Sequence, residues 1–481
     1  MYSVCRADHC RLTKGNIMAF TVSGKRNALS GKQTSNLTEG SLWKGILFFG
    51  IPLIASNLFQ ILFNMSDIAV VGRFAGPTAL GSVGSTSTLV VMITTFIIGI
   101  GSGINVVTAH ALGKQDDDEV RRTIQTSFLL CIVIGLLTLC TGELLQGLIL
   151  KLLQTKEELL DGSMLYLRIY FLGAPALAVY NFGSAVYSAA GNTRRPLMLL
   201  TASGILNIVL NLFFVIALNM DVAGVALASI IAQYCSAALI VLSLIREKTE
   251  IRLTLSGMAY DRRIAALILP ISLAAGLSNA IFQIANLFVQ YGVNTFDAVV
   301  VAGNAAAQNA DALDYDVMAA FYTAGSSFIG QNFGAGKMDR VKKSYIISTA
   351  YAFAVGTAIG LLLYAFGEPF LHLFTKDDAV AEAGIYRLSV MALSYGFSAF
   401  MDNSIAACRG LGKSAVPTVI VLLGSCAFRI VWIFTVFAYF HTITSLYLLY
   451  IFSWTVTGVA EMLYFRHAYR IAARSFSLER N

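Results

Sequence analysis

Twelve long apolar stretches, separated by short polar loops, constrain this chain more than any other feature of its sequence. A helix needs about 20 apolar residues to cross the hydrocarbon core of a bilayer. Such stretches lie near residues 44–72, 82–110, 122–146, 163–187, 195–218, 222–245, 262–293, 298–330, 343–366, 383–407, 416–440 and 444–466. Only 13% of the residues are charged, against about 25% in soluble domains. The sequence therefore predicts an all-α integral membrane protein with twelve transmembrane helices.

Loops that are rich in lysine and arginine alternate along the chain with loops that contain few of them. Of the 34 basic residues, 27 fall on the side of the N-terminus and four fall in the opposite loops. Because cytoplasmic loops carry an excess of Lys and Arg, we expect a multi-pass protein of the bacterial cytoplasmic membrane with both termini in the cytoplasm. The same loops account for the net charge of +7, so no nucleic-acid partner is expected.

The second half of the chain repeats landmarks of the first. FFGIPLIASNLFQ and LILPISLAAGLSNAIFQ place Pro52 and Pro270 218 residues apart, and two glycine-rich loops place Gly113 and Gly336 223 residues apart. AAGNTRRP and RGLGKSAVP share the spacing G-x4-P at an offset of 221. Each repeat holds six spans, an even number, so both repeats have the same orientation about an axis along the membrane normal. Two six-helix lobes of this kind are typical of alternating-access transporters, with a duplicated receptor or channel as the alternative.

The domain boundaries follow from the spans and the repeat. We predict a disordered cytoplasmic tail at 1–40, an N-lobe at 41–245, a cytoplasmic linker at 246–261, a C-lobe at 262–466 and a cytoplasmic tail at 467–481.

The first span contains a carboxylate, Asp67, in the stretch LFQILFNMSDIAVVGRF. A charged group at the centre of a membrane helix costs roughly 2.5–3.5 kcal/mol on insertion scales, so it is a functional candidate. It would bind a proton, or Na⁺ with amide and hydroxyl oxygens, or serve only as a hydrogen-bond partner in helix packing. Polar residues at helical spacing on spans 1, 5 and 6 are candidates to surround it: Gln60, Asn64, Asn207, Asn211 and Ser229.

The second lobe carries more charge within its spans. Three carboxylates on one membrane helix cannot all be buried and ionised, so some must be paired, protonated or in contact with water. The eighth span holds Asp311, Asp314 and Asp316. Asp402 and Arg429 lie on spans 10 and 11, where an ion pair between them is one alternative. The candidate acidic or substrate site of the second lobe is Asp311, Asp314, Asp402 and Arg429.

Motifs of catalysis are missing from the sequence. It contains no H-E-x-x-H, G-x-S-x-G or phosphate-binding loop. We therefore expect a transporter driven by an ion gradient rather than an enzyme, with no cofactor other than the coupling ion, H⁺ or Na⁺. No metal site is expected beyond Na⁺ at Asp67.

The chain resembles the multidrug and toxic-compound extrusion (MATE) transporters over about residues 40–470. The resemblance is carried by Pro52 and Asp67 at the spacing P-x14-D, by the following VVGRF, by the loops AAGNTRRP and RGLGKSAVP, by FIGQNFGAGKMDRVKK and by the TGVAEMLYF-type end. It implies two lobes in a V around a central cleft. It also implies efflux of bulky, often cationic compounds in exchange for a proton or Na⁺.

The resemblance also assigns roles to residues of the first lobe. The coupling acid of helix 1 corresponds to Asp67, and an Asn and an Asp on helix 5 correspond to Asn207 and Asn211. A Thr on helix 6 corresponds to Ser229. Asn211 departs from the pattern because an acid would be expected there. One carboxylate fewer makes the site less negative and leaves the choice between H⁺ and Na⁺ open.

These observations predict an antiporter that exports organic cations or other drugs as a monomer in contact with membrane lipid. Asp311 and Asp314 are candidates to attract a cationic substrate, and Phe282, Phe288 and Tyr322 to stack on it. The alternative within transporters is a flippase for a lipid-linked saccharide, which would need basic residues facing the cavity. Away from the ends of the spans, the Lys and Arg residues are Arg168, Arg387 and Arg429, and so few basic residues disfavour that alternative. A membrane-embedded receptor or enzyme has no supporting motif.

Overall fold

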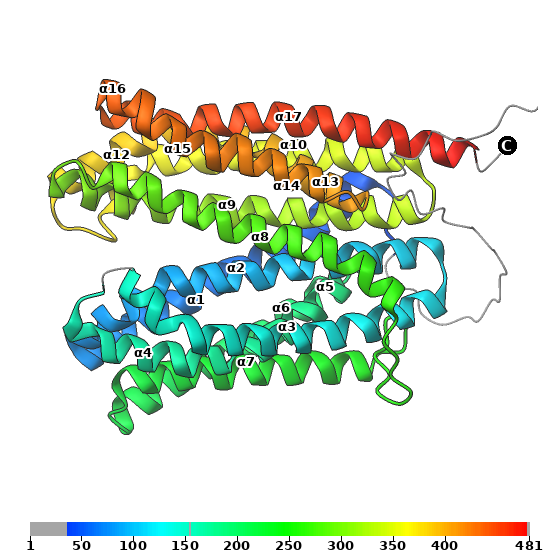
Figure 1. The fold of residues 1–481 in the computed structure, drawn as a ribbon, viewed down its shortest axis with the longest axis horizontal. Helices are drawn as coiled ribbons and strands as arrows, with labels where there is room; N and C mark the ends of the chain where they lie inside the picture. The colour runs from blue at the N-terminus through cyan, green and yellow to red at the C-terminus, as the bar shows by residue number, and fades with distance from the viewer. Residues whose placement is uncertain (1–35, 153–154, 479–481) are drawn as a thin grey trace, which may run out of the picture. The chain divides into compact units, whose positions relative to one another are not determined.

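The computed structural model describes residues 36–152 and 155–478, and every regular element in these ranges is helical (Figure 1). With no water in the hydrocarbon core, an apolar segment must satisfy its backbone groups internally, which a helix does. The N-lobe contains α1 (Leu42–Val70), α2 (Gly76–Lys114), α3 (Asp117–Leu152), α4 (Glu157–Leu172), α5 (Ala174–Ala189), α6 (Arg194–Leu212) and α7 (Asp221–Ile245). In Figure 1 these helices form the lower bundle.

The C-lobe forms the upper bundle of Figure 1. It contains α8 (Arg262–Val293), α9 (Ala298–Gly334), α10 (Met338–Ala365), α11 (Gly367–Leu371), α12 (Asp378–Met391), α13 (Ser394–Gly410), α14 (Ala415–Val421), α15 (Phe428–Trp432), α16 (Ala438–Phe440) and α17 (Ile443–Leu478). Short π-helical turns continue several of these helices: η1 (Val71–Ala75), η2 (Phe213–Ala217), η3 (Leu422–Ala427) and η4 (Ile433–Phe437). The all-helical, two-lobe fold expected from the sequence is confirmed.

Nine helices of the described residues are long and apolar enough to cross a membrane, and the pair α4 and α5 makes a tenth span. That pair bends by 45° where Pro175 opens α5. Two further segments occupy the places of predicted spans without passing the same test. One is α9, which carries the three aspartates, and the other is α12 with α13, of 14 and 17 residues. Together these segments account for the twelve predicted spans.

Segments near both ends of the described chain pack against other helices. Residues 36–40 are ordered, because the Arg340 guanidinium donates hydrogen bonds to the carbonyl oxygens of Leu37, Glu39 and Gly40 at 3.0–3.2 Å. The rest of the predicted tail, residues 1–35, lies outside the described residues. At the other end, α17 continues past the predicted span and through most of the predicted cytoplasmic tail, to Leu478. Contacts near that end, such as the ring of Phe476 against Phe333, give this extension a packed face.

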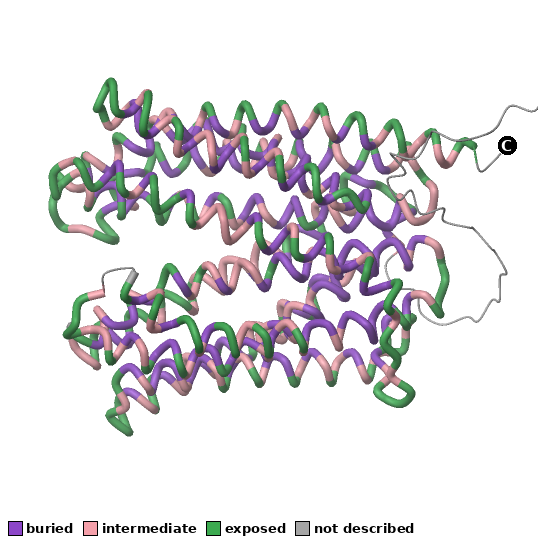
Figure 2. Tube along the Cα trace, in the orientation of Figure 1, coloured by how far each residue is buried: buried purple, intermediate pink, exposed green. Residues whose placement is uncertain are grey.

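The first helix of each lobe packs its beginning into the other lobe. Leu42, Ile46 and Phe49 of α1 belong to a buried apolar cluster made mostly of C-lobe residues. The beginning of α8 does the reverse, with Ile264 and Ile268 buried in the N-lobe cluster. This reciprocal arrangement is consistent with the internal repeat and joins the lobes through α1 and α8. Along most helices, Figure 2 shows burial changing about once per turn, as expected when one face packs on protein.

The lobes are sealed together at one end, called here the basic end because the Lys- and Arg-rich loops and the end of α17 lie there. In the middle of the bundle, α2 and α8 approach so closely that a Cβ on Gly99 would lie 2.5 Å from Cα of Gly276. Small residues permit such backbone contact between membrane helices. Nearer the basic end, Asn105 hydrogen-bonds Ser327 at 3.0 Å and Gln331 donates to the Ala189 carbonyl at 2.6 Å.

Candidate functional site

The carboxylate of Asp67, in the last turn of α1, accepts hydrogen bonds from two neutral groups of the N-lobe. The Asn211 amide on α6 donates to one carboxylate oxygen, and the Ser229 hydroxyl on α7 donates to the other at 3.1 Å. Both partners are buried. Three helices of the same lobe therefore converge on one acid.

Asn207 completes this group, which we call the Asp67 cluster (Asp67, Asn207, Asn211 and Ser229). Its amide donates to the Ser229 hydroxyl at 3.4 Å, and its carbonyl oxygen accepts from the Asn211 amide at 3.3 Å. Asn207 and Asn211 are four residues apart and so share one face of α6. The carbonyl oxygen of Asn211 is buried without a hydrogen-bond partner among the described residues. The cluster thus presents side-chain oxygens in excess of its donors.

A glycine sets the distance between the helices that carry the cluster. A Cβ on Gly204 of α6 would lie 1.9 Å from the ring of Phe63. Phe63 lies one turn before Asp67 on α1, so the ring of Phe63 fills the space that a side chain at 204 would take. This contact brings α1 against α6 one to two helical turns before the point where Asp67 meets Asn211.

Asp67 forms no ion pair with any described residue. Gln60 is half-buried and Asn64 exposed, and neither hydrogen-bonds to Asp67 in the described structure, although both were candidates. Asn57, on the same polar stripe, instead donates to the backbone carbonyl of Asp316 on α9 at 2.7 Å. That residue therefore joins the two lobes rather than the Asp67 cluster.

The C-lobe has a second polar group, in which the acid is paired with a base. Asp311 on α9 forms an ion pair with Arg387 on α12 and accepts a hydrogen bond from the Tyr395 hydroxyl on α13. Arg387 is 1% exposed and also donates to the Asn304 amide oxygen at 2.6 Å. Its guanidinium lies 5.1 Å from the ring centre of Tyr447. The positive charge is thus compensated by a carboxylate, an amide oxygen and an aromatic face.

Other residues of the predicted second-lobe site are divided among separate environments. Asp314 is fully buried and lacks hydrogen-bond partners among the described residues. Arg429 donates to Asn286 at 2.8 Å and lies 4.8 Å from the ring centre of Tyr450. An ion pair between Arg429 and Asp402, one alternative from the sequence, is not formed in the described structure. The guanidinium is occupied by Asn286 and aromatic rings instead.

Sequence reasoning did not identify the partners of Asp311. Arg387 is visible in the sequence as a basic residue inside a span, which is a functional signal by itself. Its pairing with Asp311 depends on the packing of α12 against α9, which one sequence does not show. The aromatic candidates differ in accessibility: Tyr322 is buried and donates to the Met318 sulfur, whereas Phe288 is 37% exposed.

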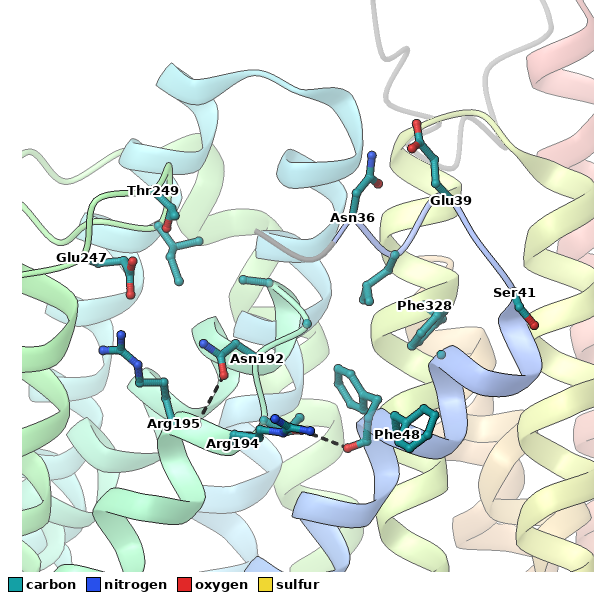
Figure 3. Close-up of a pocket in the computed structure, with 17 residues that line it drawn as sticks. Asn36, Glu39, Ser41, Phe48, Asn192, Arg194, Arg195, Glu247, Thr249 and Phe328 are labelled. Atoms are coloured by element: carbon teal, nitrogen blue, oxygen red, sulfur yellow. Dashed lines mark hydrogen bonds between the residues drawn. The ribbon is translucent and has the colours of Figure 1, made fainter. Parts of the chain in front are cut away.

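A pocket of about 570 Å³ lies at the basic end, away from both polar groups. It is lined by the segment before α1, the turn between α5 and α6, and the connection after α7. Figure 3 shows Arg195 and Glu247 on one side of it and Phe48 and Phe328 on the other. Phe328 belongs to α9, so the pocket lies between the lobes at their sealed end.

The duplicated helical lobes, together with a half-buried acid that neutral donors of two other N-lobe helices hold within the spans, are features of a membrane transporter. A model of the MatE family matches residues 52–213 and again residues 274–435, two ranges that begin 222 residues apart. The chain belongs to the MatE family. The double match has the same offset as the internal repeat, so each lobe is one copy of the family's unit.

Curated relatives and a solved structure agree with this assignment. The chain is 27% identical over 377 residues, 78% of its length and 84% of the relative's, to the probable multidrug resistance protein YpnP of Bacillus subtilis. It is 22% identical over 369 residues, 76% of its length and 81% of the relative's, to an FAD transporter of Shewanella oneidensis. The outward-facing structure of a multidrug resistance MATE family transporter aligns with a TM-score of 0.85 at 21% identity, covering 92% of this chain and all of that one. The protein is a multi-pass membrane transporter of the multidrug efflux type and not an enzyme.

Proposed function

We propose that the protein is an ion-coupled antiporter that exports bulky, cationic organic compounds across the cytoplasmic membrane, with Asp67 as the group that binds the coupling ion. The observation that carries the proposal is the set of neutral partners around Asp67. An acid locked to a basic residue has its charge compensated permanently. Among the described residues, Asn211 and Ser229 are the hydrogen-bond donors to Asp67, so a proton or Na⁺ can neutralise its charge.

The position of Asp67 relative to the sealed end supports this role. Hydrogen bonds between the lobes of the described residues extend from the basic end to the middle of the bundle, where Asn57 meets Asp316 and Asn279 meets Thr95. Asp67 lies about 15 Å farther along α1 than Asn57, at 1.5 Å per residue. The cluster therefore lies toward the end where no such hydrogen bond joins the lobes. In the proposed orientation the basic end is cytoplasmic, so this conformation is closed to the cytoplasm.

The proposed cycle depends on the difference between the closed basic end and the opposite end, toward which Asp67 lies. Substrate leaves the central cleft toward the outer side, and a coupling ion then reaches Asp67 from the same side. Neutralising the carboxylate removes the cost of keeping a charge out of water and favours closure of the outer side. Opening of the basic end releases the ion to the cytoplasm and admits the next substrate.

The Asp67 cluster contains oxygens for either coupling ion. A proton needs only the carboxylate, whereas Na⁺ would also use the Asn207, Asn211 and Ser229 oxygens, of which the Asn211 carbonyl has no other partner. A flippase for anionic pyrophosphate lipids is disfavoured further by the structure. Arg387 and Arg429 are buried and already bonded, so neither presents a free guanidinium to a phosphate.

Efflux measured in proteoliposomes tests the proposal. A fluorescent organic cation is loaded, and a pH gradient and a Na⁺ gradient are imposed separately, with protein-free liposomes as the control. We expect concentrative transport under one gradient, which identifies the ion. FAD as a competing substrate tests the substrate class, since one relative is named for it. Absence of transport under both gradients would contradict ion coupling, and preferential transport of FAD would contradict a cationic substrate.

A further inference from the structure

A carboxyl group without a partner is buried in the C-lobe, outside the Asp67 cluster. Asp314 on α9 is 0% exposed, and neither of its side-chain oxygens has a hydrogen-bond partner among the described residues. Buried polar groups in proteins are nearly always hydrogen-bonded. An isolated carboxylate is so costly to bury that such a group neutralises instead. Asp314 therefore requires a bound positive species, and its surroundings decide which one.

No base among the described residues forms an ion pair with Asp314. The nearest charged residue on its own helix face is another acid, Asp311, one turn earlier on α9. Asp311 is itself held by Arg387 of α12 and Tyr395 of α13. The Tyr395 hydroxyl donates to Asp311 and the Tyr322 hydroxyl donates to the Met318 sulfur, so neither of these hydrogen bonds goes to Asp314. The neighbouring helix α10 carries no charged residue beyond Lys343. The guanidinium of Arg387 is thus already paired with Asp311.

The oxygens left over at this place are too few for a metal ion. Hard cations with oxygen ligands take about six of them. The carboxylate of Asp311 is already engaged with a guanidinium and a phenol, which leaves the two oxygens of Asp314. A proton requires only one of these.

The helix that carries Asp314 also meets the other lobe. α9 packs against α10, α12 and α13 of the C-lobe and against α1 and α2 of the N-lobe. The bond from Asn57 of α1 ends on the backbone carbonyl of Asp316, two residues from Asp314. A movement of α1 relative to α9 therefore acts on the turn that holds Asp314.

We propose that Asp314 is a second proton-binding site, occupied while the basic end is closed and exchanging its proton when α1 and α9 move apart. The Asp311–Arg387 ion pair does not exchange a proton in this proposal. Because Arg387 is paired with Asp311, its guanidinium cannot neutralise Asp314, which binds a proton instead. The exchange step rests on the proposed antiport function, whereas the occupancy of the site does not. Occupancy and exchange are therefore measured separately.

Infrared spectroscopy of the purified protein tests occupancy without transport. A protonated carboxylic acid has a C=O stretching band that a carboxylate lacks. We expect the band of the wild-type protein near neutral pH to lose intensity in Asp314→Asn and to stay unchanged in Asp378→Asn, whose side chain is 97% exposed. An identical band in wild type and Asp314→Asn would overturn the proposal. A band that the wild type loses on addition of Na⁺, with no such change in Asp314→Asn, would assign a metal ion to the site. That result would also overturn the proposal.

A second variant keeps the test valid if Asp314→Asn does not fold. Asp314→Glu retains an acid at this position with a longer side chain, so the band is expected to shift in frequency and not to disappear. A band in Asp314→Glu that does not differ from wild type would contradict protonation of residue 314.

Proton counting tests exchange. In proteoliposomes with a pH-sensitive dye, Asp314→Asn is expected to move about one proton fewer per exported substrate than the wild type. An unchanged proton count in Asp314→Asn would overturn exchange at this site. If the wild type shows no gradient-driven transport at all, the antiport function fails while the infrared result still decides whether Asp314 binds a proton.

Discussion

Each lobe contains a half-buried acid within its spans, and the charges of these two acids are compensated in opposite ways. In the N-lobe, Asp67 is surrounded by an amide and a hydroxyl, which stabilise a charge without cancelling it. In the C-lobe, Asp311 is paired directly with the guanidinium of Arg387. Neutral donors leave a site whose charge depends on what binds there, whereas a buried ion pair holds one charge state. The N-lobe therefore has an acid whose charge can change, Asp67, whereas the C-lobe adds a fixed ion pair beside its own proposed proton site, Asp314.

The largest difference between the two groups is expected when the fixed pair is broken. Arg387→Met removes the partner of Asp311 and leaves a poorly solvated charge, which costs about 3–5 kcal/mol of stability. We expect a large drop in thermal stability in detergent, together with loss of folded protein on expression. The double variant Asp311→Asn with Arg387→Met removes both charges and is expected to recover most of this stability. If Arg387→Met were as stable as the wild type, the Asp311–Arg387 ion pair would not contribute to stability.

Ser229→Ala is expected to have the next largest effect, and on the ion rather than on the fold. The hydroxyl favours the charged form of Asp67, and a hydrogen bond to a charged group contributes about 1.5–3 kcal/mol. Without it the protonated form is favoured, so the pH at half-maximal transport is expected to move upward by about one unit. Ser236→Ala on the same helix, where the hydroxyl bonds only the Gln233 carbonyl, should leave the pH profile unchanged. A downward shift in Ser229→Ala would contradict this geometry.

Asn211→Asp tests whether a second acid makes the N-lobe site more selective for a metal cation. Two carboxylates at this distance repel each other unless a cation lies between them. We expect Na⁺ to stabilise the variant against heat, with an apparent affinity about tenfold higher than in the wild type, or about 1.4 kcal/mol. Choline chloride at the same concentration is the control for ionic strength. Equal stabilisation by both salts would show that the pocket does not enclose a cation.

The smallest effect is expected for the stability of Asp67→Asn. An amide at this position accepts one of the two hydrogen bonds through its oxygen, its NH2 group can donate to the Ser229 hydroxyl oxygen, and no ion pair is lost. The melting temperature is therefore expected to stay close to that of the wild type, in contrast to the loss predicted for Arg387→Met. A loss of several kcal/mol would place Asp67 among the structural groups and remove the distinction between the lobes.

Much of the fold could be predicted from the sequence because bilayer length and loop charge act on each segment independently. The Asp67 cluster was also accessible, since Asn207 and Asn211 show helical spacing and the resemblance identified their partners. The apolar pattern marks the membrane span near 444–466 and not the end of α17, which continues to Leu478. Residues 36–40 were missed because their ordering depends on Arg340, a residue some 300 positions away.

The C-lobe was less predictable because its contacts depend on tertiary packing between helices. Arg387 and Arg429 are equivalent in the sequence, each a lone basic residue in an apolar span. Packing gives one of them an acid and the other an amide and aromatic rings. Nothing in helical spacing distinguishes these outcomes. The sequence therefore suggested an ion pair for Arg429, which the structure does not contain, and did not identify the ion pair of Arg387.

The role of Asp67 is tested most directly by comparing concentrative efflux of an organic cation by the wild type, Asp67→Asn and Asp378→Asn under the driving gradient. Substrate binding to each protein is measured alongside. The account predicts that Asp67→Asn binds substrate but no longer concentrates it, while Asp378→Asn behaves as the wild type. Concentrative efflux by Asp67→Asn at the wild-type rate would contradict the account.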